Sequence, residues 1–343
     1  MPFDARRAER THRGGRCSIS PVSTLTGQPI RPVVIAHRGA SGYLPEHTFP
    51  AKALAYTMGA DYLEQDVVAT KDGQLIVLHD IHLDRVTNVA KLFPGRHRAD
   101  GRFYAKDFLL SDIKRLYVHE RTTADGAPVY PGRFRSAGEV FRVHTFAEEL
   151  AFIQNLEKSV GRPVGIYPEI KRPAWHREEG VDITPPFLKV LRDFGYTSHS
   201  DPVYVQCFDA VELVRIRKDH NCGLKLIQLI GENAWQESTT DYDRLRTTRG
   251  LKQLARTVDG IGPWVDRLYR VGAKGAIRDS GLVSRAHQAG LAVHPYTFRK
   301  DDLPPGFKTF EDLLEFTIDK LNVDGLFTDF PDLVAKKCTA PSP

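Results

Sequence analysis

The chain has 343 residues, of which 41% are hydrophobic and 27% charged, values that are ordinary for a globular protein. The net charge is +5, and the first sixteen residues alone hold five arginines, so the remaining body is close to neutral. This distribution argues against nucleic-acid binding by the body, and no stretch approaches the roughly 18 apolar residues of a membrane-spanning helix. The length suits one large α/β barrel or two smaller domains.

The N-terminal segment and the cysteines carry little structural information. Residues 1–32 are polar and arginine-rich, and we interpret them as a disordered leader. Because they lack the apolar segment of a secretory signal, we expect a cytoplasmic location, or a periplasmic one if the true start lies elsewhere. The four cysteines form no Cys-x-x-Cys pair and no zinc-site spacing, and a chain of this size needs no disulfide bonds.

Short apolar runs bounded by turn signals recur along the chain and predict buried strands. The predicted strands cover residues 33–36, 62–70, 75–78, 165–170, 203–207, 225–230, 258–262, 291–296 and 325–328. Capping residues that precede amphipathic segments predict helices that begin at or near Thr48, Thr145, Thr184, Asp209, Ser280 and Thr309. A weakly patterned region at 231–257 is also expected to be helical.

The second and third predicted strands are joined by a tight turn at Lys71-Asp72-Gly73-Gln74. A parallel crossover takes about a dozen residues, so these two strands must be antiparallel. The hairpin therefore returns His79 towards Glu64 and Asp66.

Residues 83–144 interrupt the alternation of strands and helices. They contain several Pro-Gly and Asp-Gly turn signals and one short helix predicted from Ser111. We interpret them as an insertion over one face of a single domain that covers 33–336, followed by a tail at 337–343.

Eight strands remain when the antiparallel return strand is set aside, each followed by a helical segment. Eight such units predict a (β/α)8 TIM barrel with one extra hairpin strand. An open doubly wound sheet is the alternative, but no glycine-rich nucleotide-binding loop supports it.

In a barrel the C-terminal strand ends converge on one face, where sites are built. Glu64, Asp66 and Glu169 would meet there, and three like charges repel unless a cation joins them. Ligation by oxygen alone suits Mg²⁺ or Ca²⁺ and does not suit Zn²⁺. The alternative is a structural ion network with Arg38 and Lys171, and the spacing does not distinguish the two.

Two histidines, His37 and His79, directly follow apolar strands beside these carboxylates. A pair of imidazoles can serve as general base and general acid on opposite sides of one displacement. Arg38 can offer a bidentate fork to a phosphate and Lys171 a point charge. Together with a metal, this set suits a phosphodiester. The sequence does not decide which histidine is the base, although we favour His79.

Several aromatic residues stand near the same strand ends and could line a substrate cleft, while each alone is more often a packing residue. They are Tyr43, Phe208, Trp264, Tyr296 and Phe330. Glu46 lies just before the first predicted helix, where it could complete a metal shell or cap the helix.

Four separated motifs carry a resemblance to a known family. The segments HRGASGYLPEHT, YLEQDVVATKDGQLIVLHD, IYPEIK and VDGLFTDFPD occur in this order, and together they resemble the glycerophosphodiester phosphodiesterases, most closely the bacterial type with a long insertion. The likeness runs from about residue 33 to 335. It implies a phospholipase C-like barrel that hydrolyses glycerophosphodiesters, such as glycerophosphocholine and glycerophosphoethanolamine, to an alcohol and sn-glycerol 3-phosphate.

The resemblance also implies roles for individual residues. His37 and His79 look like the acid–base pair. Glu64, Asp66 and Glu169 look like ligands of Ca²⁺ or Mg²⁺. The phosphate contacts would be Arg38 and Lys171, and we expect Phe208, Trp264 and Tyr296 to contact the small-molecule substrate.

Two other functions are compatible with the same motifs. One is a phospholipase D-like lyase on lysolipids, against which the long insertion and the absence of a plausible loop disulfide near His79 argue. The other is a non-catalytic phosphodiester-binding protein, which would not require both histidines. The sequence predicts neither the head group nor the choice between Ca²⁺ and Mg²⁺ nor the oligomeric state.

Overall fold

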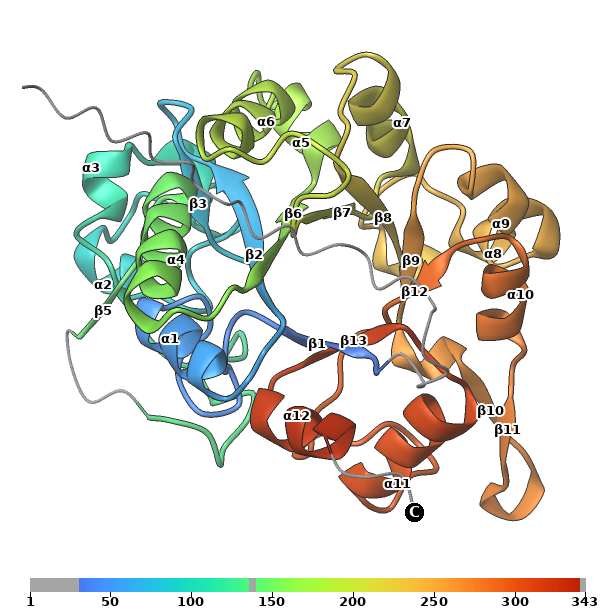
Figure 1. Ribbon diagram of the computed structural model, residues 1–343. Coiled ribbons are helices and arrows are strands. Elements are labelled where there is room, and N and C mark those ends of the chain that lie inside the picture. Colours follow the sequence, from blue (N-terminus) through green and yellow to red (C-terminus); the bar gives the residue numbers. More distant parts are fainter. Residues whose placement is uncertain (1–30, 136–139, 340–343) are drawn as a thin grey trace, which may run out of the picture.

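The computed structural model describes residues 31–135 and 140–339, so most of the predicted leader and the end of the predicted tail lie outside the described residues. The described chain forms a ring of parallel strands surrounded by helices (Figure 1). The predicted TIM barrel is therefore confirmed.

Eight parallel strands make up the ring, and their order around it follows their order in the chain. They are β1 (Val33–Ala36), β2 (Tyr62–Ala69), β6 (Gly165–Ile170), β7 (Tyr204–Cys207), β8 (Lys225–Ile230), β9 (Gly260–Pro263), β12 (Ala292–Val293) and β13 (Gly325–Thr328). Backbone hydrogen bonds from Asp324 N to Val293 O (3.1 Å) and from Phe327 N to Pro295 O (3.0 Å) join β13 to β12 and close the ring.

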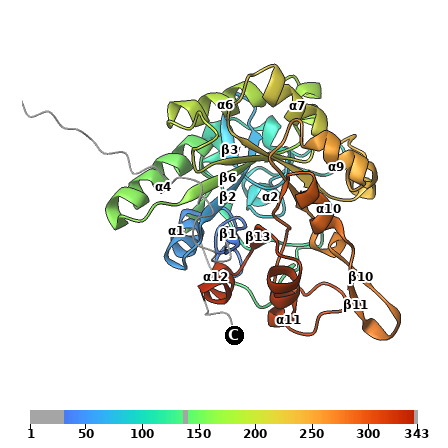
Figure 2. The ribbon, with the colours of Figure 1, turned by 45° about the vertical axis from the view of Figure 1, so that its right-hand side comes forward.

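Helices cover the outside of the ring, as the turned view in Figure 2 shows. The larger ones are α1 (Phe49–Thr57), α4 (Phe146–Val160), α6 (Thr184–Asp193), α7 (Ala210–Lys218), α9 (Thr248–Leu254), α10 (Leu282–Gln288), α11 (Phe310–Leu314), which continues as a π-helix over Glu315–Lys320, and α12 (Pro331–Thr339). In the part of the chain that the structure describes, no helix combines the length and the apolarity needed to span a membrane.

Capping side chains explain where several helices begin. Thr48 accepts a hydrogen bond from the backbone N–H of Ala51. Thr145 and Glu148 form a reciprocal capping box at the start of α4. The caps satisfy backbone donors that have no partner within the helix, and the predicted starts of both helices are confirmed.

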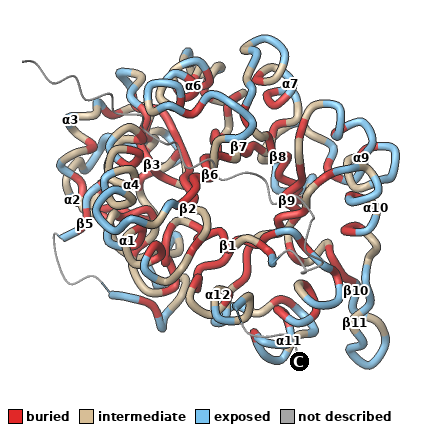
Figure 3. Tube along the Cα trace, in the orientation of Figure 1, coloured by how far each residue is buried: buried red, intermediate tan, exposed pale blue. Residues whose placement is uncertain are grey.

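The strands are buried on both faces, which is why their sequences read as continuous apolar runs (Figure 3). One face packs against the helices in the main core of the protein. The other face fills the barrel interior with a small cluster of Ile35, Tyr167, Ile227 and Phe327. Side chains thus fill the barrel interior, and the polar residues at the strand ends lie above this packed layer.

The hairpin partner β3 (Leu75–Val77) pairs antiparallel with β2, as the tight turn predicted. On its outer side the segment predicted as an insertion builds a hydrophobic core of its own, with Val68 and Ile76 of the hairpin and Phe108, Leu116 and Phe141 among its members. The segment is thus packed on the edge of the barrel next to the strand that carries the first two carboxylates.

The secondary structure departs from expectation in one region, and it has two further features that were not foreseen. The region predicted as helical at 231–257 holds only a 3₁₀ turn and two short helices, α8 (Tyr242–Leu245) and α9. A hairpin, β10 (Tyr269–Val271) with β11 (Ile277–Asp279), was not expected, and it projects from the barrel (Figure 1). Helix α12 continues to Thr339, beyond residue 336, because Val334 on its inner face packs into the main core.

Candidate active site

All ten side chains predicted for the site line one cavity of about 250 Å³ at the C-terminal ends of the barrel strands. They are His37, Arg38, Glu64, Asp66, His79, Glu169, Lys171, Phe208, Trp264 and Tyr296. Residues from distant strand ends thus meet in one cavity, because strand ends in a parallel barrel converge on one face. The role of each residue is a separate question that the contacts address.

His37 directly follows β1 and is held by a carboxylate from the far end of the chain. Its Nδ1 lies 2.6 Å from Oδ1 of Asp329, which follows β13. Arg299 and His37 keep the pKa of Asp329 well below its usual range despite burial. The ionised carboxylate can only accept, so His37 carries its proton on Nδ1 and keeps a lone pair on Nε2. Burial and the neighbouring Arg38 lower the pKa of His37 to about 3.

His79 is held in the same way by the residue that follows it. Its Nδ1 lies 2.6 Å from Oδ1 of Asp80. The pKa of Asp80 is well below its usual range, because the cation of Arg121 outweighs the effect of burial. Burial, Arg38 and Lys171 lower the pKa of His79. Both histidines are therefore neutral and protonated on Nδ1, and both line the cavity.

Arg38 adopts a left-handed backbone conformation with φ of 59°, which turns its backbone N–H onto Oε2 of Glu64 at 2.6 Å. Its Nη1 donates to Glu46 at 2.9 Å, and its Nε lies 3.6 Å from Asp66 without a hydrogen-bond partner. Glu46 also accepts from Arg121. Glu46 is therefore engaged by two guanidinium groups, and it neither caps α1 nor joins the close group of metal-ligand candidates.

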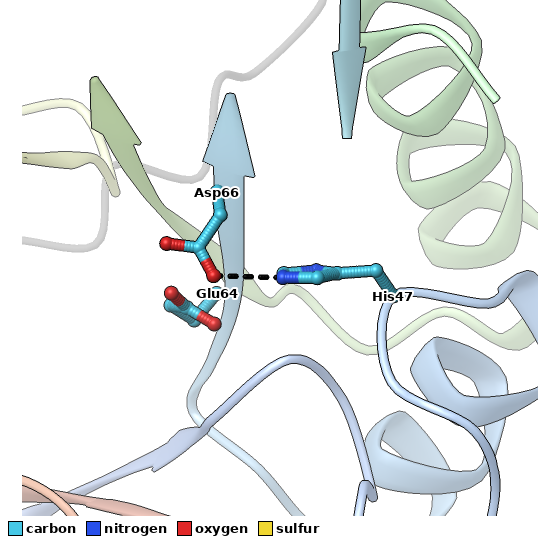
Figure 4. Close-up of side chains that lie close together, drawn as sticks. All are labelled: His47, Glu64 and Asp66. Atoms are coloured by element: carbon cyan, nitrogen blue, oxygen red, sulfur yellow. Dashed lines mark hydrogen bonds and ion pairs between the residues drawn. The ribbon is translucent and has the colours of Figure 1, made fainter. Parts of the chain in front are cut away.

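The structure places three candidate metal ligands close together, with ligand atoms within 4.8 Å of one another, and these are His47, Glu64 and Asp66. Glu64 and Asp66 project from the same face of β2, and His47 reaches them from the loop before α1 (Figure 4). This group differs in one member from the predicted trio, because it contains His47 and not Glu169. The sequence analysis assigned no role to His47.

The contacts of His47 argue that it orients Asp66 and does not itself bind a metal. Its Nε2 lies 2.8 Å from Oδ2 of Asp66, and its Nδ1 lies 3.5 Å from Nζ of Lys52. An ammonium group can only donate, so Nδ1 accepts and Nε2 carries the proton that is donated to Asp66. Lys52 is in turn fixed by an ion pair with Glu149 at 3.0 Å.

Glu169 lines the same cavity but is directed to Lys171, whose Nζ lies 2.9 Å from its Oε1 and 3.6 Å from Oδ1 of Asp66. The predicted ion network with Lys171 is thus present. Burial raises the pKa of Glu169 to about 8, although Lys171 opposes the shift. Burial and the charge of Asp66 raise the pKa of Glu64 well above its usual range. Burial therefore outweighs the nearby cations at both carboxyl groups.

This donor set fits a hard divalent cation. Three buried carboxylates meet in one cavity, and Oδ1 of Asp66 has no hydrogen-bond partner within the described residues. Burial is the main cause that raises the pKa values of Glu64 and Glu169, and a cation bound between them would favour their ionised forms. Oxygen ligands without sulfur or free imidazole are those that Mg²⁺ and Ca²⁺ prefer.

The three predicted aromatic residues form one wall of the cavity. Phe208 packs edge-to-face with Tyr296 at a centroid distance of 5.9 Å, and Nζ of Lys171 lies 5.6 Å from the centre of the Phe208 ring. Trp264 packs with Trp235 at 5.0 Å. The wall is apolar and faces the polar group of carboxylates.

Tyr43 and Phe330 do not belong to this wall. They pack edge-to-face with each other at 5.3 Å, and Tyr43 donates to the carboxylate of Asp332. Neither is among the residues that line the cavity in the described part of the chain. These contacts fit the alternative that Tyr43 and Phe330 are packing residues.

Comparison with known proteins agrees with this geometry. The sequence profile described as the Glycerophosphoryl diester phosphodiesterase family matches residues 37–333. A glycerophosphodiester phosphodiesterase of Haemophilus influenzae is 45% identical over 319 residues, which cover 88% of each chain. Another from Treponema pallidum is 40% identical over 323 residues, covering 89% of this chain and 91% of the relative.

The chain belongs to the glycerophosphoryl diester phosphodiesterase family. It is therefore a hydrolase of phosphoric diesters. Solved members share the fold at lower identity. An Oleispira antarctica phosphodiesterase in complex with the product sn-glycerol-3-phosphate superposes with a TM-score of 0.60 at 21% identity, covering 90% of this chain and 98% of that one. An Agrobacterium tumefaciens glycerophosphodiester phosphodiesterase gives 0.57 at 20% identity, covering 89% and 99%.

The phosphodiesterase cavity contains residues to which the sequence analysis gave no role. Gln206 of β7 donates to Glu64 and to the carbonyl of Tyr167 at 3.5 and 3.3 Å, and its buried Oε1 has no partner among the described residues. Asp329 and Gln206 stand at strand ends, so their position was visible in the sequence. Trp235 and Arg299 follow no comparable signal, since Trp235 ends a short 3₁₀ turn and Arg299 lies in a loop.

Proposed function

We propose that this enzyme hydrolyses glycerophosphodiesters, such as glycerophosphocholine and glycerophosphoethanolamine, to an alcohol and sn-glycerol 3-phosphate in a reaction that needs Ca²⁺ or Mg²⁺. The observation that carries the proposal is the pair of neutral imidazoles. His37 and His79 each bind a carboxylate through Nδ1, that of buried Asp329 or half-buried Asp80, and line the same cavity as three acidic residues and Arg38. The names of the Haemophilus influenzae and Treponema pallidum relatives support the substrate class.

The residues of the chain fit distinct roles in such a reaction. Glu64 and Asp66, with Glu169, would hold the cation, which would neutralise charge on the phosphate oxygens. Arg38 has an unpartnered Nε at the cavity and can donate to the same phosphate. Lys171 adds a second positive charge, and Phe208, Trp264 and Tyr296 would pack against the apolar face of the glycerol.

The two histidines can move the protons that the reaction requires. Nε2 of one imidazole takes a proton from the nucleophile, either the glycerol 2-hydroxyl or a water molecule, as the new P–O bond forms. The other imidazole gives a proton to the oxygen of the departing alcohol as the old P–O bond breaks. If the 2-hydroxyl attacks, water then opens the cyclic phosphate, and both routes end at sn-glycerol 3-phosphate.

The direct test is release of sn-glycerol 3-phosphate from a panel of glycerophosphodiesters, measured by a coupled dehydrogenase assay with Ca²⁺ or Mg²⁺ and with EDTA. We expect turnover that EDTA abolishes. Intact glycerophosphocholine and glycerophosphoethanolamine after incubation with either metal would sink the proposal. Cyclic phosphate as the final product would instead favour a lyase.

Variants at the histidines test the mechanism separately. We expect His37→Ala and His79→Ala each to lower kcat by about 10²- to 10⁴-fold, the usual contribution of a positioned acid or base. His199→Ala is a matched control, because His199 also binds a carboxylate, that of Asp259 at 2.9 Å, but lies on the surface. Near-normal turnover of either active-site variant would refute the acid–base assignment while leaving the reaction class intact.

A further inference from the structure

Two arginines of the segment predicted as an insertion reach the same two carboxylates that hold the histidines. Nη1 of Arg121 lies 2.7 Å from Oδ2 of Asp80, and Nη2 of Arg133 lies 2.8 Å from Oδ2 of Asp329. Each aspartate thus accepts from a histidine on one oxygen and from an arginine of this segment on the other. The same arrangement occurs on both sides of the cavity, although the two arginines are 12 positions apart in an irregular segment.

Each arginine also binds a carboxylate in a loop of the barrel, in addition to its aspartate. Arg121 holds Glu46, in the loop after β1, through Nε at 2.9 Å and Nη2 at 2.6 Å. Arg133 holds Asp301, in the loop after β12, through Nε at 2.8 Å and Nη2 at 3.0 Å. Such two-point contacts fix the plane of the guanidinium group. Only 15% and 4% of the two side chains are exposed, so solvent weakens these contacts little.

The segment also forms part of the surroundings of the histidines. A second cavity of about 140 Å³ adjoins the first, and both are lined by His37, Arg38 and His79. On the far side this second cavity is lined by Arg121 and Arg133. Among the residues that line these two cavities, Arg121 and Arg133 line only the second, whereas Phe208, Trp264 and Tyr296 line only the first.

We propose that Arg121 and Arg133 are positioning residues that hold His79 and His37 in the Nδ1-protonated form required for catalysis, so that this segment is part of the catalytic apparatus. The inference rests on the proposed function for what the histidines do. An aspartate that keeps its charge and orientation can only accept from Nδ1–H. Without its arginine, the carboxylate is free to rotate away or to take up a proton, and the imidazole can change tautomer or turn.

Asp329 and Asp80 are bound by different numbers of arginines, so the two arginine variants should differ in the size of their effect. Asp329 accepts a further hydrogen bond from Nε of Arg299, which follows β12, at 2.7 Å. Within the described residues, Arg121 is the one arginine that binds Asp80. The loss of Arg121 should therefore disturb His79 more than the loss of Arg133 disturbs His37.

The experiment compares Arg121→Met and Arg133→Met in the full-length enzyme loaded with metal. We expect kcat to fall about 100-fold for the first and about 10-fold for the second, the range typical of residues that orient a reacting group. KM should change by less than about three-fold, because neither arginine is expected to touch the substrate. Arg102→Met is the matched control, since Arg102 binds Asp84 at 2.8 Å within the same segment, and it should keep wild-type kcat.

A second readout separates positioning from stability and from the proposed reaction itself. Two-bond ¹H–¹⁵N correlation spectra of ¹⁵N-histidine-labelled protein report which ring nitrogen carries the proton. We expect the Nδ1-protonated pattern for both histidines in the wild type, and a mixed pattern for His79 in Arg121→Met and for His37 in Arg133→Met. Arg121→Lys and Arg133→Lys, which keep the charge, should fold and regain part of the loss.

Unchanged kcat in both Met variants would overturn the proposal, and so would a lowered kcat with wild-type tautomers. A wild-type protein that shows no turnover would remove the proposed function. The tautomer spectra would still test whether the arginines fix the imidazoles.

Discussion

The buried ion pair of Lys52 and Glu149 allows a quantitative test of how the site is supported. Nζ of Lys52 lies 3.0 Å from Oε1 of Glu149, and both side chains are fully buried. The second oxygen of Glu149 lies 2.5 Å from Nε2 of His144. Lys52 also faces Nδ1 of His47, which holds Asp66. Lys52→Met would leave the carboxylate of Glu149 buried beside imidazoles alone.

The size of the effect follows from the pKa of Glu149. Burial alone would raise it, but Lys52 and the hydrogen bond from His144 lower the pKa from 4.5 to about 2. At about 1.4 kcal/mol per pKa unit, this shift corresponds to about 3 kcal/mol of stability. Breaking a buried ion pair typically costs about 3–5 kcal/mol. We therefore expect Lys52→Met to lower the free energy of unfolding at pH 7 by about 3 kcal/mol or more.

The loss should depend on pH. In the wild type the pKa of Glu149 is depressed, so its contribution to stability is present above 4.5, the pKa of the unfolded state, and is lost as the pH falls through about 2. In Lys52→Met the pKa of the buried carboxyl is raised, and its ionisation destabilises the fold at higher pH. The difference between wild type and variant is therefore largest near neutral pH and shrinks towards pH 4.

Urea unfolding in EDTA, followed by tryptophan fluorescence, measures this difference without a contribution from bound metal. Lys189→Met is the control, because Lys189 pairs with Asp193 on the surface, with side chains 67% and 53% exposed, and should cost less than about 0.5 kcal/mol. Adding Glu149→Gln to Lys52→Met should restore more than half of the loss. A single variant within about 1 kcal/mol of wild type, or a double variant as unstable as the single, would refute the reasoning.

Three further predictions follow from individual contacts. Because the pKa of Glu169 is raised to about 8, cation binding at pH 7 should release protons, and the affinity should increase as the pH approaches 8. Calorimetry in buffers of different ionisation enthalpy measures the proton release, and equal binding heats in all buffers would contradict this prediction. Gln206→Leu removes a donor to a proposed metal ligand and should weaken cation binding about 10-fold in the same titration, whereas unchanged affinity would exclude this role. In Gly42→Ala the added Cβ would lie 2.3 Å from the ring of Phe330, so thermal unfolding should show that the free energy of unfolding falls by about 1–3 kcal/mol. Gly132→Ala, whose added Cβ has no atom within 4 Å, should keep the wild-type stability. Equal stabilities of the two variants would contradict this prediction.

The barrel and the position of its cavity were predictable because their signals are local. The strands Val33–Ala36 and Lys225–Ile230 match the predicted runs residue for residue, since a strand buried on both faces is mostly apolar. The return of His79 followed from the length of one turn. Once eight strands are parallel, the convergence of their ends follows from geometry.

The support of the site was not predictable, because it depends on contacts between distant parts of the chain. Arg133 and Asp329 are 196 positions apart, and no periodicity marks which arginines of an irregular segment turn inwards. His47 lies within a recognised motif, but its role depends on Lys52 one helical turn later and on Glu149 in α4. The sequence therefore indicated which groups meet in the cavity and not which neighbours fix their protonation.

That protonation raises a requirement for the proposed reaction. In the free enzyme both His37 and His79 are neutral, so the histidine pair offers two bases and no imidazolium acid. After burial, Arg38 is the largest influence that lowers both pKa values. An anionic phosphodiester bound at Arg38 would offset that charge and raise the pKa of whichever imidazole lies nearest to it. The bound substrate would thus generate the imidazolium acid. Histidine spectra recorded at several pH values with sn-glycerol 3-phosphate should then show a raised pKa for one imidazole, whereas unchanged pKa values for both would exclude this role of the substrate.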